Sequence, residues 1–232
     1  MEQPILLDLG CGAGGASFGY NRVGFLIIGV DIESQPHYPF QFIKADMLEI
    51  LQAVIAGDVQ VDAIHASPPC QRFSKMTKCR PGLNDTHVDL IEPVRFLLRR
   101  TNLPYVIENV PGSPLVDPVT LCGSQFGLRF DWDQWPSESV YLRRHRLFET
   151  HGFDLPDAGE HDHSGAALTV AGHGRPDRRF KGAKNYTDAA RRLMQCPWMT
   201  QREIREAVPP AYTAYVGAHL MNRLRTEYVL TG

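Results

Sequence analysis

Residues 4–15, Pro4-Ile5-Leu6-Leu7-Asp8-Leu9-Gly10-Cys11-Gly12-Ala13-Gly14-Gly15, join a short apolar run to a turn that is rich in glycine. Such an apolar run is typical of a parallel strand buried on both faces. Glycine lets the backbone turn sharply and approach a ligand closely. A helix that begins after the turn, near residue 16, would offer free N–H groups and a positive dipole end to an anionic group. The stretch therefore predicts the strand, turn and helix that open an α/β fold.

The same alternation of strands and helices continues along the chain. Further apolar, β-rich runs occupy residues 25–32, 42–47, 61–66 and 103–110. Helical patterns lie between or after them, at residues 47–55, 88–100 and 211–228. This order predicts a doubly wound, mostly parallel sheet. Periodicity weakens after residue 110, where short β-like pieces such as 119–122 remain. We expect a main domain at 1–150, a small region at 151–200 and a C-terminal helix, within 201–232, that returns to the main domain.

Composition sets broad limits on the kind of protein. The 232 residues suffice for one sizeable core with a small appendage. The net charge of −2 excludes a global polycation, so a nucleic-acid surface would have to be local. No apolar run approaches the ~18 residues of a membrane span. The first residues, Met-Glu-Gln-Pro, lack the pattern of a signal peptide. We therefore expect a cytoplasmic protein without a membrane partner.

Cysteine and histidine spacing predicts neither a disulfide framework nor a metal site. The five cysteines are widely spaced and include no C-x-x-C pair. His161-Asp162-His163 has no cysteine near it in the sequence, and we interpret it as a polar loop. Four of the cysteines are interpreted as structural or incidental: Cys11, Cys79, Cys122 and Cys196.

Acidic residues close three of the predicted strands, and one cysteine follows a fourth. Asp31, Asp46 and Glu108 stand at these strand ends, where open α/β sheets bind their ligands. Asp31 lies about 20 residues past the glycines, which favours a contact with ribose hydroxyls over a turn or helix cap. Cys70 follows Ser67-Pro68-Pro69, and the two prolines keep it out of strand and helix. That placement suits a nucleophile, and a small buried cysteine is the alternative.

Two basic stretches are candidates for contact with phosphate. The loop after Cys70 carries Arg72, Lys75, Lys78 and Arg80 before its first acid, Asp85. Between Gly172 and Arg192 there are seven Lys or Arg against two acids, with Phe180 and Tyr186 between them. Basic and aromatic side chains together suit a nucleic-acid surface. The alternatives are a solvated face for the first stretch and a flexible surface loop for the second.

The order of these motifs resembles the C5-cytosine DNA methyltransferases, which have the class I S-adenosylmethionine-dependent, Rossmann-like fold. The resemblance runs through nearly the whole chain, and Pro69-Cys70-Gln71 followed by Glu108-Asn109-Val110 is its specific part. The other matching pieces are Asp8 to Gly15, Asp31-Ile32, Ala45-Asp46-Met47, Arg144-His145-Arg146 and Ala207-Val208-Pro209. Three positions depart from the usual pattern: Gly10 replaces a phenylalanine, Leu142 a glutamine and Glu206 an asparagine.

The resemblance implies a role for each matching residue. Cys70 would add to C6 of a flipped cytosine, Glu108 would serve N3, Arg146 would hold O2 and a phosphate, and Arg144 would support the site. S-adenosylmethionine would be bound by Asp8, Gly10, Cys11, Gly12, Ala13, Gly14, Gly15, Asp31, Ile32, Asp46, Met47, Pro69 and Val208. DNA would be bound by Gln71, Arg72, Ser74, Arg175, Arg178, Arg179 and Lys181. No metal ligand is implied.

The short region at 151–200 is typical of small, compact members, such as those carried by phages. It implies a monomer with a small target-recognition region and a short or relaxed target sequence. The expected activity is methyl transfer from S-adenosylmethionine to C5 of cytosine in DNA. The alternatives are C5 modification of a cytosine nucleotide or RNA, and a non-catalytic DNA-binding relative.

Overall fold

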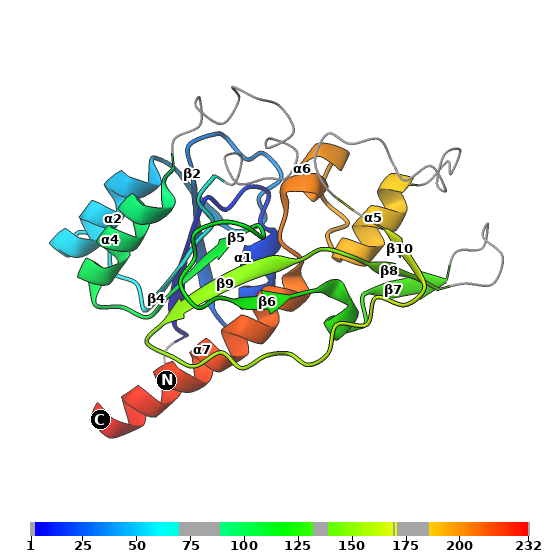
Figure 1. The fold of residues 1–232 in the computed structure, drawn as a ribbon. Helices are drawn as coiled ribbons and strands as arrows, with labels where there is room; N and C mark the ends of the chain where they lie inside the picture. Colours follow the sequence, from blue (N-terminus) through cyan, green and yellow to red (C-terminus); the bar gives the residue numbers. More distant parts are fainter. Residues whose placement is uncertain (1–2, 70–88, 132–138, 169, 171–185, 232) are drawn as a thin grey trace.

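A computed structural model describes residues 3–69, 89–131, 139–168, 170 and 186–231 of the chain. Its main sheet has seven strands in the order β3-β2-β1-β4-β5-β9-β6. Five of them are parallel: β1 (Ile5–Leu9), β2 (Leu26–Asp31), β3 (Gln41–Lys44), β4 (Ala63–Ala66) and β5 (Tyr105–Asn109). The predicted doubly wound, mostly parallel sheet is confirmed (Figure 1).

Helices cover both faces of this sheet. On one face lie α2 (Met47–Ala56) and α4 (Ile91–Thr101), and on the other α1 (Gly15–Arg22) and α7 (Pro210–Thr231) (Figure 1). Alternate strand residues serve the two faces: Leu7 packs in one apolar cluster with Leu51 and Leu98, and Leu6 in the other with Tyr212. Burial on both faces explains why these strands read as continuous apolar runs.

The chain reverses its direction of winding between β1 and β4, which are neighbours in the sheet. Their carboxyl ends meet there, because the Ser67 N–H donates to the Leu9 carbonyl over 2.8 Å. Gly10 has φ +74°, and a Cβ on it would lie 2.5 Å from the Ser67 carbonyl oxygen. Only glycine fits this turn without strain. Ligands of doubly wound folds bind at such a switch point.

Two antiparallel strands extend the sheet beyond β5. β9 (Arg146–His151) pairs with β5, and β6 (Val119–Leu121) pairs with β9. The register sets Glu108 opposite Phe148 and Asn109 opposite Leu147, so the start of β9 lies beside the end of β5. Arg146, the first residue of β9, is thereby brought to the carboxyl end of β5.

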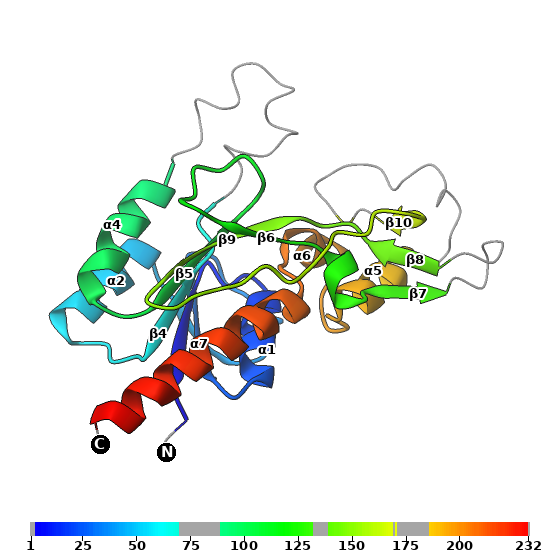
Figure 2. The same ribbon diagram turned by 60° about the horizontal axis from the view of Figure 1, so that its bottom comes forward.

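A second, three-stranded sheet has the order β10-β8-β7, made of β7 (Arg129–Asp131), β8 (Ser139–Leu142) and β10 (Ala166–Leu168). The 3-10 helix η2 (Gly123–Phe126) leads into it from β6. Figure 2 shows this sheet and α5 (Tyr186–Met194) at one side of the molecule, away from α2 and α4. Two of its strands precede residue 150, and β9 then returns to the main sheet.

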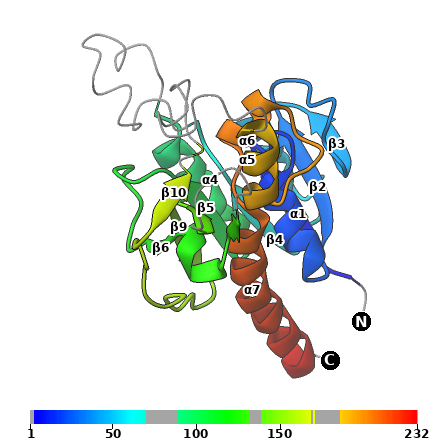
Figure 3. The same ribbon diagram turned by 90° about the vertical axis from the view of Figure 1, so that its right-hand side faces the viewer.

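The C-terminal segment returns to the main sheet. α6 (Gln201–Glu206) is followed by α7, which packs along α1. Figure 3 shows α7 running down the molecule to a C-terminus near the N-terminus. Within the described residues, no helix is both long and apolar enough to cross a membrane.

Candidate active site

A buried carboxyl group and an arginine meet at the carboxyl end of β5. Glu108 is 5% exposed, and its Oε1 lies 2.9 Å from Arg146 Nε, at the start of β9. This contact is an ion pair by distance, but the N–H is not aligned for a hydrogen bond, and Oε1 accepts none from the described residues. The carboxyl group is therefore paired with Arg146 through Oε1 and keeps Oε2 for other contacts.

A chain of hydrogen bonds reaches the other oxygen of Glu108. Ser67 Oγ donates to Glu108 Oε2 over 3.0 Å, and His65 Nε2 lies 3.0 Å from Ser67 Oγ. Tyr20 OH lies 2.9 Å from His65 Nδ1. Because the serine hydroxyl donates to the carboxylate, it must accept from the imidazole, which then accepts from the tyrosine hydroxyl. Each of these three hydrogen bonds is therefore donated in the direction of Glu108.

Burial shifts the pKa values of Glu108 and His65, two residues in this hydrogen-bond series. The pKa of Glu108 is raised by burial, although Arg146, Ser67 and Arg144 each act to lower it. Burial also lowers the pKa of His65 to about 3, so the imidazole is neutral at physiological pH. A buried carboxyl with a raised pKa can hold a proton and donate it, as an acid catalyst must.

Arg144 is buried and is directed at backbone carbonyls. Its guanidinium donates to the carbonyls of Val170, Arg205 (2.8 Å) and Ala207 (2.7 Å). Tyr212 OH in turn donates to the Arg144 carbonyl over 2.5 Å. The arginine thus ties the segment before β9 to the segments after β10 and α6.

The segment that leads to Cys70 is tied to β5. Asn109 Nδ2 donates to the Pro68 carbonyl over 3.0 Å. Pro69 is the last described residue before the gap at 70–88. The predicted residues Cys70, Gln71, Arg72 and Ser74 lie outside the described residues, as do Arg175, Arg178, Arg179 and Lys181.

The glycine-rich turn is held by the acid at the end of β2. Asp31 Oδ2 accepts from the Gly12 N–H over 3.0 Å, and Oδ1 accepts from the Glu33 N–H over 2.9 Å. The next residue, Ile32, is 67% exposed. A Cβ placed on Gly12 would meet no atom within 4 Å, so the turn faces open space there. Helix α1 begins after Gly14 with no side-chain cap on its N–H groups.

Of the other predicted cofactor residues, two lie at the start of α2 and two are buried in the turn. Asp46 Oδ1 caps α2 by accepting from the Leu48 N–H over 2.7 Å, so the predicted strand over residues 42–47 ends at Lys44, before this cap. Met47 is the first residue of α2. Cys11 and Ala13 are buried, and burial raises the pKa of the Cys11 thiol.

Asp8 is enclosed beneath the turn. It is fully buried and accepts a hydrogen bond from Ser17 Oγ, which also lies 2.8 Å from Tyr38 OH. Burial raises the pKa of Asp8 to about 7. Through Ser17, this buried carboxyl ties β1 to α1.

The C-terminal segment also contacts the turn. A Cβ on Gly15 would collide with the Val208 carbonyl oxygen, so this glycine permits close approach of the two segments. Val208 is 5% exposed. Trp198 Nε1 donates to the Ala13 carbonyl over 2.9 Å, and its ring packs on Phe18.

Part of the chain is similar to a known protein family. Residues 5–116 match the model of the C-5 cytosine-specific DNA methylase family. This part of the chain is similar to that family. The match spans β1 to the segment after β5, which holds the glycine-rich turn, Ser67 and Glu108.

Two curated relatives cover part of the chain. The type II methyltransferase M.XorII of Xanthomonas oryzae pv. oryzae is 31% identical over 126 residues, which is 48% of this chain and 29% of the relative. The type II methyltransferase M.FnuDI of Fusobacterium nucleatum is 32% identical over 115 residues, 46% of this chain and 32% of the relative. The aligned part thus spans about a third of these relatives.

Solved structures extend the similarity of fold to almost the whole chain. S. pombe Dnmt2 methyltransferase aligns with a TM-score of 0.54 at 13% identity, covering 96% of this chain and 99% of that one. A Spodoptera frugiperda DNMT2 mutant aligns with a TM-score of 0.56 at 15% identity and the same coverage. The class I methyltransferase fold expected from the resemblance is confirmed.

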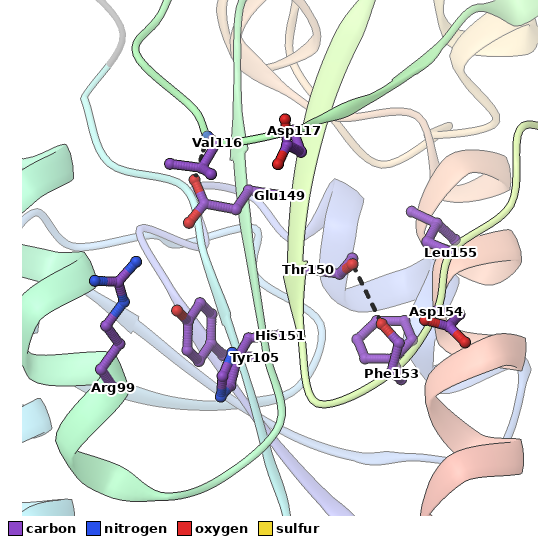
Figure 4. A pocket seen from close by; sticks show the side chains of 10 residues that line it. All are labelled: Arg99, Tyr105, Val116, Asp117, Glu149, Thr150, His151, Phe153, Asp154 and Leu155. Carbon is purple, nitrogen blue, oxygen red and sulfur yellow. Dashed lines mark hydrogen bonds between the residues drawn. The ribbon is translucent and has the colours of Figure 1, made fainter.

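The structure also has a hollow away from the switch point. A cavity of about 350 Å³ is lined by residues that include Arg99, Tyr105 and His151. Tyr105 begins β5 and His151 ends β9, and the register pairs these two residues, at the opposite end of both strands from Glu108 (Figure 4). The cavity is therefore separate from the candidate active site.

Sequence reasoning missed several residues that support the site. Tyr20, His65 and Ser67 form the hydrogen-bond chain to Glu108, and Asn109 holds the Pro68 segment. The one available signal was the polar His65 within an apolar strand. A lone histidine in a strand is ordinary, so only the pairing of β4 with β5 reveals its partners.

Proposed function

We propose that this protein transfers a methyl group from S-adenosylmethionine to C5 of cytosine in DNA. The observation that carries the proposal is Glu108, a buried acid with a raised pKa, held at the switch-point edge beside Arg146. It lies near the end of β5, the strand next to β4, and the chain runs from β4 through Pro68 and Pro69 into Cys70. An acid and a thiol on neighbouring strand ends suit the activation of a pyrimidine.

The proposed chemistry begins with the cysteine. The Cys70 thiolate forms a bond to C6, and the displaced electron pair moves through the ring to N3. Glu108 donates its proton to N3, which leaves C5 electron-rich enough to attack the methyl carbon. The bond between the methyl group and the sulfonium sulfur breaks, and the sulfur departs as a neutral thioether. A base such as water then takes the C5 proton, whose electron pair forms the C5–C6 double bond and expels Cys70 as a thiolate, and the N3 proton returns to Glu108. The family resemblance suggests these roles, and the raised pKa of Glu108 supports its part.

Arg146 would couple arrival of the base to protonation of Glu108. In the structure its Nε lies 2.9 Å from Glu108 Oε1, and its charge opposes protonation of the carboxyl. When Arg146 turns to O2 of the base and a phosphate, that opposition weakens while burial remains. The pKa of Glu108 then rises further, and the acid form is present when the base is in place.

The turn and the end of β2 have features that fit S-adenosylmethionine, which supplies an electrophilic methyl group on a sulfonium. Asp31 stands at the carboxyl end of its strand, where a carboxylate can accept from ribose hydroxyls. The exposed Ile32 side chain offers an apolar surface for adenine. The uncapped N–H groups of α1 offer a place for the methionine carboxylate. Asp46 and Met47 adjoin this region at the start of α2.

The small sheet and α5 would form the target-recognition region. This region takes in β7 and β8 as well as residues within 151–200. Because this region is small, we infer that the protein acts as a monomer and recognises a short or relaxed DNA sequence. Gln71, Arg72, Ser74, Arg175, Arg178, Arg179 and Lys181 would supply DNA contacts. The base would be flipped out of the duplex to reach Cys70.

Bisulfite sequencing tests the proposal. DNA from cells without their own C5 methylation would be sequenced after expression of the wild type, Cys70→Ser or the matched control Cys79→Ser. We expect C5 methylation with the wild type and Cys79→Ser and none with Cys70→Ser. Absence of methylation with well-expressed wild type would contradict the proposal.

The alternative substrates are separated by mass spectrometry of nucleosides. The purified protein would be incubated with DNA, RNA or dCMP and the methyl donor. Product on DNA supports the proposal, whereas product confined to RNA or dCMP would reassign the substrate. A folded protein that binds DNA without product on any of them would be a non-catalytic relative.

A further inference from the structure

Four side chains of types that can bind metals converge from segments beside β6, β9 and β10. Cys122, His145, His161 and His163 each place one donor atom so that all four atoms lie within 4.8 Å of one another. Cys122 Sγ and His163 Nε2 are 3.5 Å apart. Among the described residues, this is the only group of three or more histidine, cysteine or acidic side chains with such spacing.

The four residues come from three separate parts of the chain. Cys122 follows β6 and caps η2, His145 directly precedes β9, and His161 and His163 lie in the segment before β10. We interpreted residues 161–163 as a polar loop because no cysteine lies near them in the sequence. In the fold, however, Cys122 contacts His163 although the two residues are 41 positions apart.

We propose that these four side chains bind a structural Zn²⁺ ion. One thiolate and three imidazoles are a donor set that zinc favours, and four protein ligands make a closed tetrahedral site. With bonds of about 2.0–2.3 Å, the ligand atoms of such a site lie about 3.4 Å apart. The Cys122–His163 distance matches that spacing, and the other donors need to approach by at most about 1.4 Å.

The surroundings of the cluster hold its parts in place. Gln125 Oε1 accepts from the Cys122 N–H over 2.8 Å, and Gln125 Nε2 donates to the Gly159 carbonyl over 2.6 Å. Tyr141 OH donates to the His163 carbonyl over 3.0 Å. These bonds fix the cysteine and the histidine segment from both sides. Such outer contacts are typical of metal sites, where they orient the ligands.

The ion would fasten the small sheet to the arginines of the proposed active site. His145 stands between Arg144 and Arg146, while His161 and His163 lead into β10 of the small sheet. His145 and His161 already stack with ring centres 5.5 Å apart. One ion bound to both segments would fix the position of the small sheet relative to Arg146. This inference does not depend on the proposed methyl transfer.

Metal content and cobalt spectroscopy test the site on the full chain, with any affinity tag removed. After dialysis, elemental analysis of the wild type should give one zinc per chain. Replacement by Co²⁺ under reducing, oxygen-free conditions should give ligand-field bands of a tetrahedral site and a thiolate-to-cobalt charge-transfer band. Less than about a tenth of an equivalent of zinc, together with no cobalt bands in folded protein, would overturn the proposal.

Variants assign the ligands. Cys122→Ser should abolish the charge-transfer band, and His161→Ala should lower zinc content at least tenfold after dialysis. The matched controls Cys196→Ser, a buried cysteine outside the cluster, and His219→Ala should keep both signals. A charge-transfer band that persists in Cys122→Ser would overturn the assignment. Circular dichroism identifies any variant that fails to fold. If Cys122→Ser does not fold, the zinc content of His161→Ala, a change at a half-buried residue, tests the assignment.

Thermal unfolding gives an independent readout. Zinc at about 100-fold above its Kd should raise the Tm of the metal-free wild type by roughly 5–10 °C. The same zinc should leave the Tm of metal-free His161→Ala nearly unchanged. An equal rise in both proteins would contradict specific binding at this cluster.

Discussion

Ser67 Oγ donates a hydrogen bond to Glu108 Oε2 over 3.0 Å, joining the carboxyl ends of β4 and β5. His65 lies behind the serine at 3.0 Å, and Tyr20 lies behind the histidine at 2.9 Å. The proposed acid is therefore fixed from the core side through one oxygen. Its other oxygen, Oε1, lies 2.9 Å from Arg146 Nε.

Glu108→Gln removes the proton donor while keeping the size of the side chain. We expect methyl transfer to cytosine in DNA to fall at least about 100-fold, because an amide cannot protonate N3. Folding should persist, since the amide oxygen can still accept from Ser67. The rate with labelled methyl donor measures the effect. The control Glu206→Gln, at an exposed glutamate, should retain the wild-type rate. Equal rates for both variants would contradict an acid role for Glu108.

Ser67→Ala should change the pH dependence of the reaction. The hydrogen bond from Ser67 lowers the pKa of Glu108, so its removal raises that pKa. Because the protonated acid is the active form, activity that is lost with rising pH should persist to higher pH in the variant. The pH profile of kcat/KM measures this shift. Ser113→Ala, whose hydroxyl makes no hydrogen bond within the described residues, is the control. A shift to lower pH would oppose the proposed protonation state.

Ile32→Ala should weaken binding of S-adenosylmethionine without affecting stability. The Ile32 side chain is 67% exposed, so truncation costs little in the folded protein but removes the apolar surface for adenine. We expect the Kd to rise about tenfold, which corresponds to about 1.4 kcal/mol. Leu26, 47% exposed at the other end of β2, provides the control Leu26→Ala. Titration calorimetry that finds the same Kd for both variants would place the adenine elsewhere.

Asp8→Asn should increase the free energy of unfolding over that of the wild type more at high pH than at low pH. The folded state raises the pKa of Asp8 from 3.8 to about 7, so the folded state binds the proton more tightly than the unfolded chain. That contribution to stability is complete below pH 3.8 and is lost progressively as the pH rises to about 7. The gain from the variant between pH 4 and pH 8 is at most about 4 kcal/mol. Urea unfolding of both proteins at the two pH values measures it. A gain that is larger at pH 4 would contradict the assignment.

The sequence was sufficient to predict what depends on local pattern. The apolar runs predict β1, β2, β4 and β5, and the glycines after Leu9 predict the turn. Asp31 was predicted at the end of its strand because an acid after an apolar run is visible locally. Boundaries were less certain: the run 42–47 ends as a strand at Lys44, because Asp46 caps the following helix.

Pairings over long distances could not be read from the sequence. β9 enters beside β5 in the antiparallel direction, and only this places Arg146 against Glu108. The small sheet combines strands from before and after residue 150, so no break in composition marks its start. Cys122 and His163 meet for the same reason. In each case the contact depends on tertiary packing of segments whose local patterns are weak.

Covalent trapping on 5-fluorocytosine DNA tests the central claim most directly, because fluorine at C5 cannot leave as a proton does. The purified protein would be mixed with a 5-fluorocytosine duplex and S-adenosylmethionine, denatured, and mapped by mass spectrometry. We predict a stable adduct that carries the transferred methyl group, with the DNA attached to Cys70. A folded protein that binds the duplex but forms no adduct, or an adduct at another residue, would contradict the account.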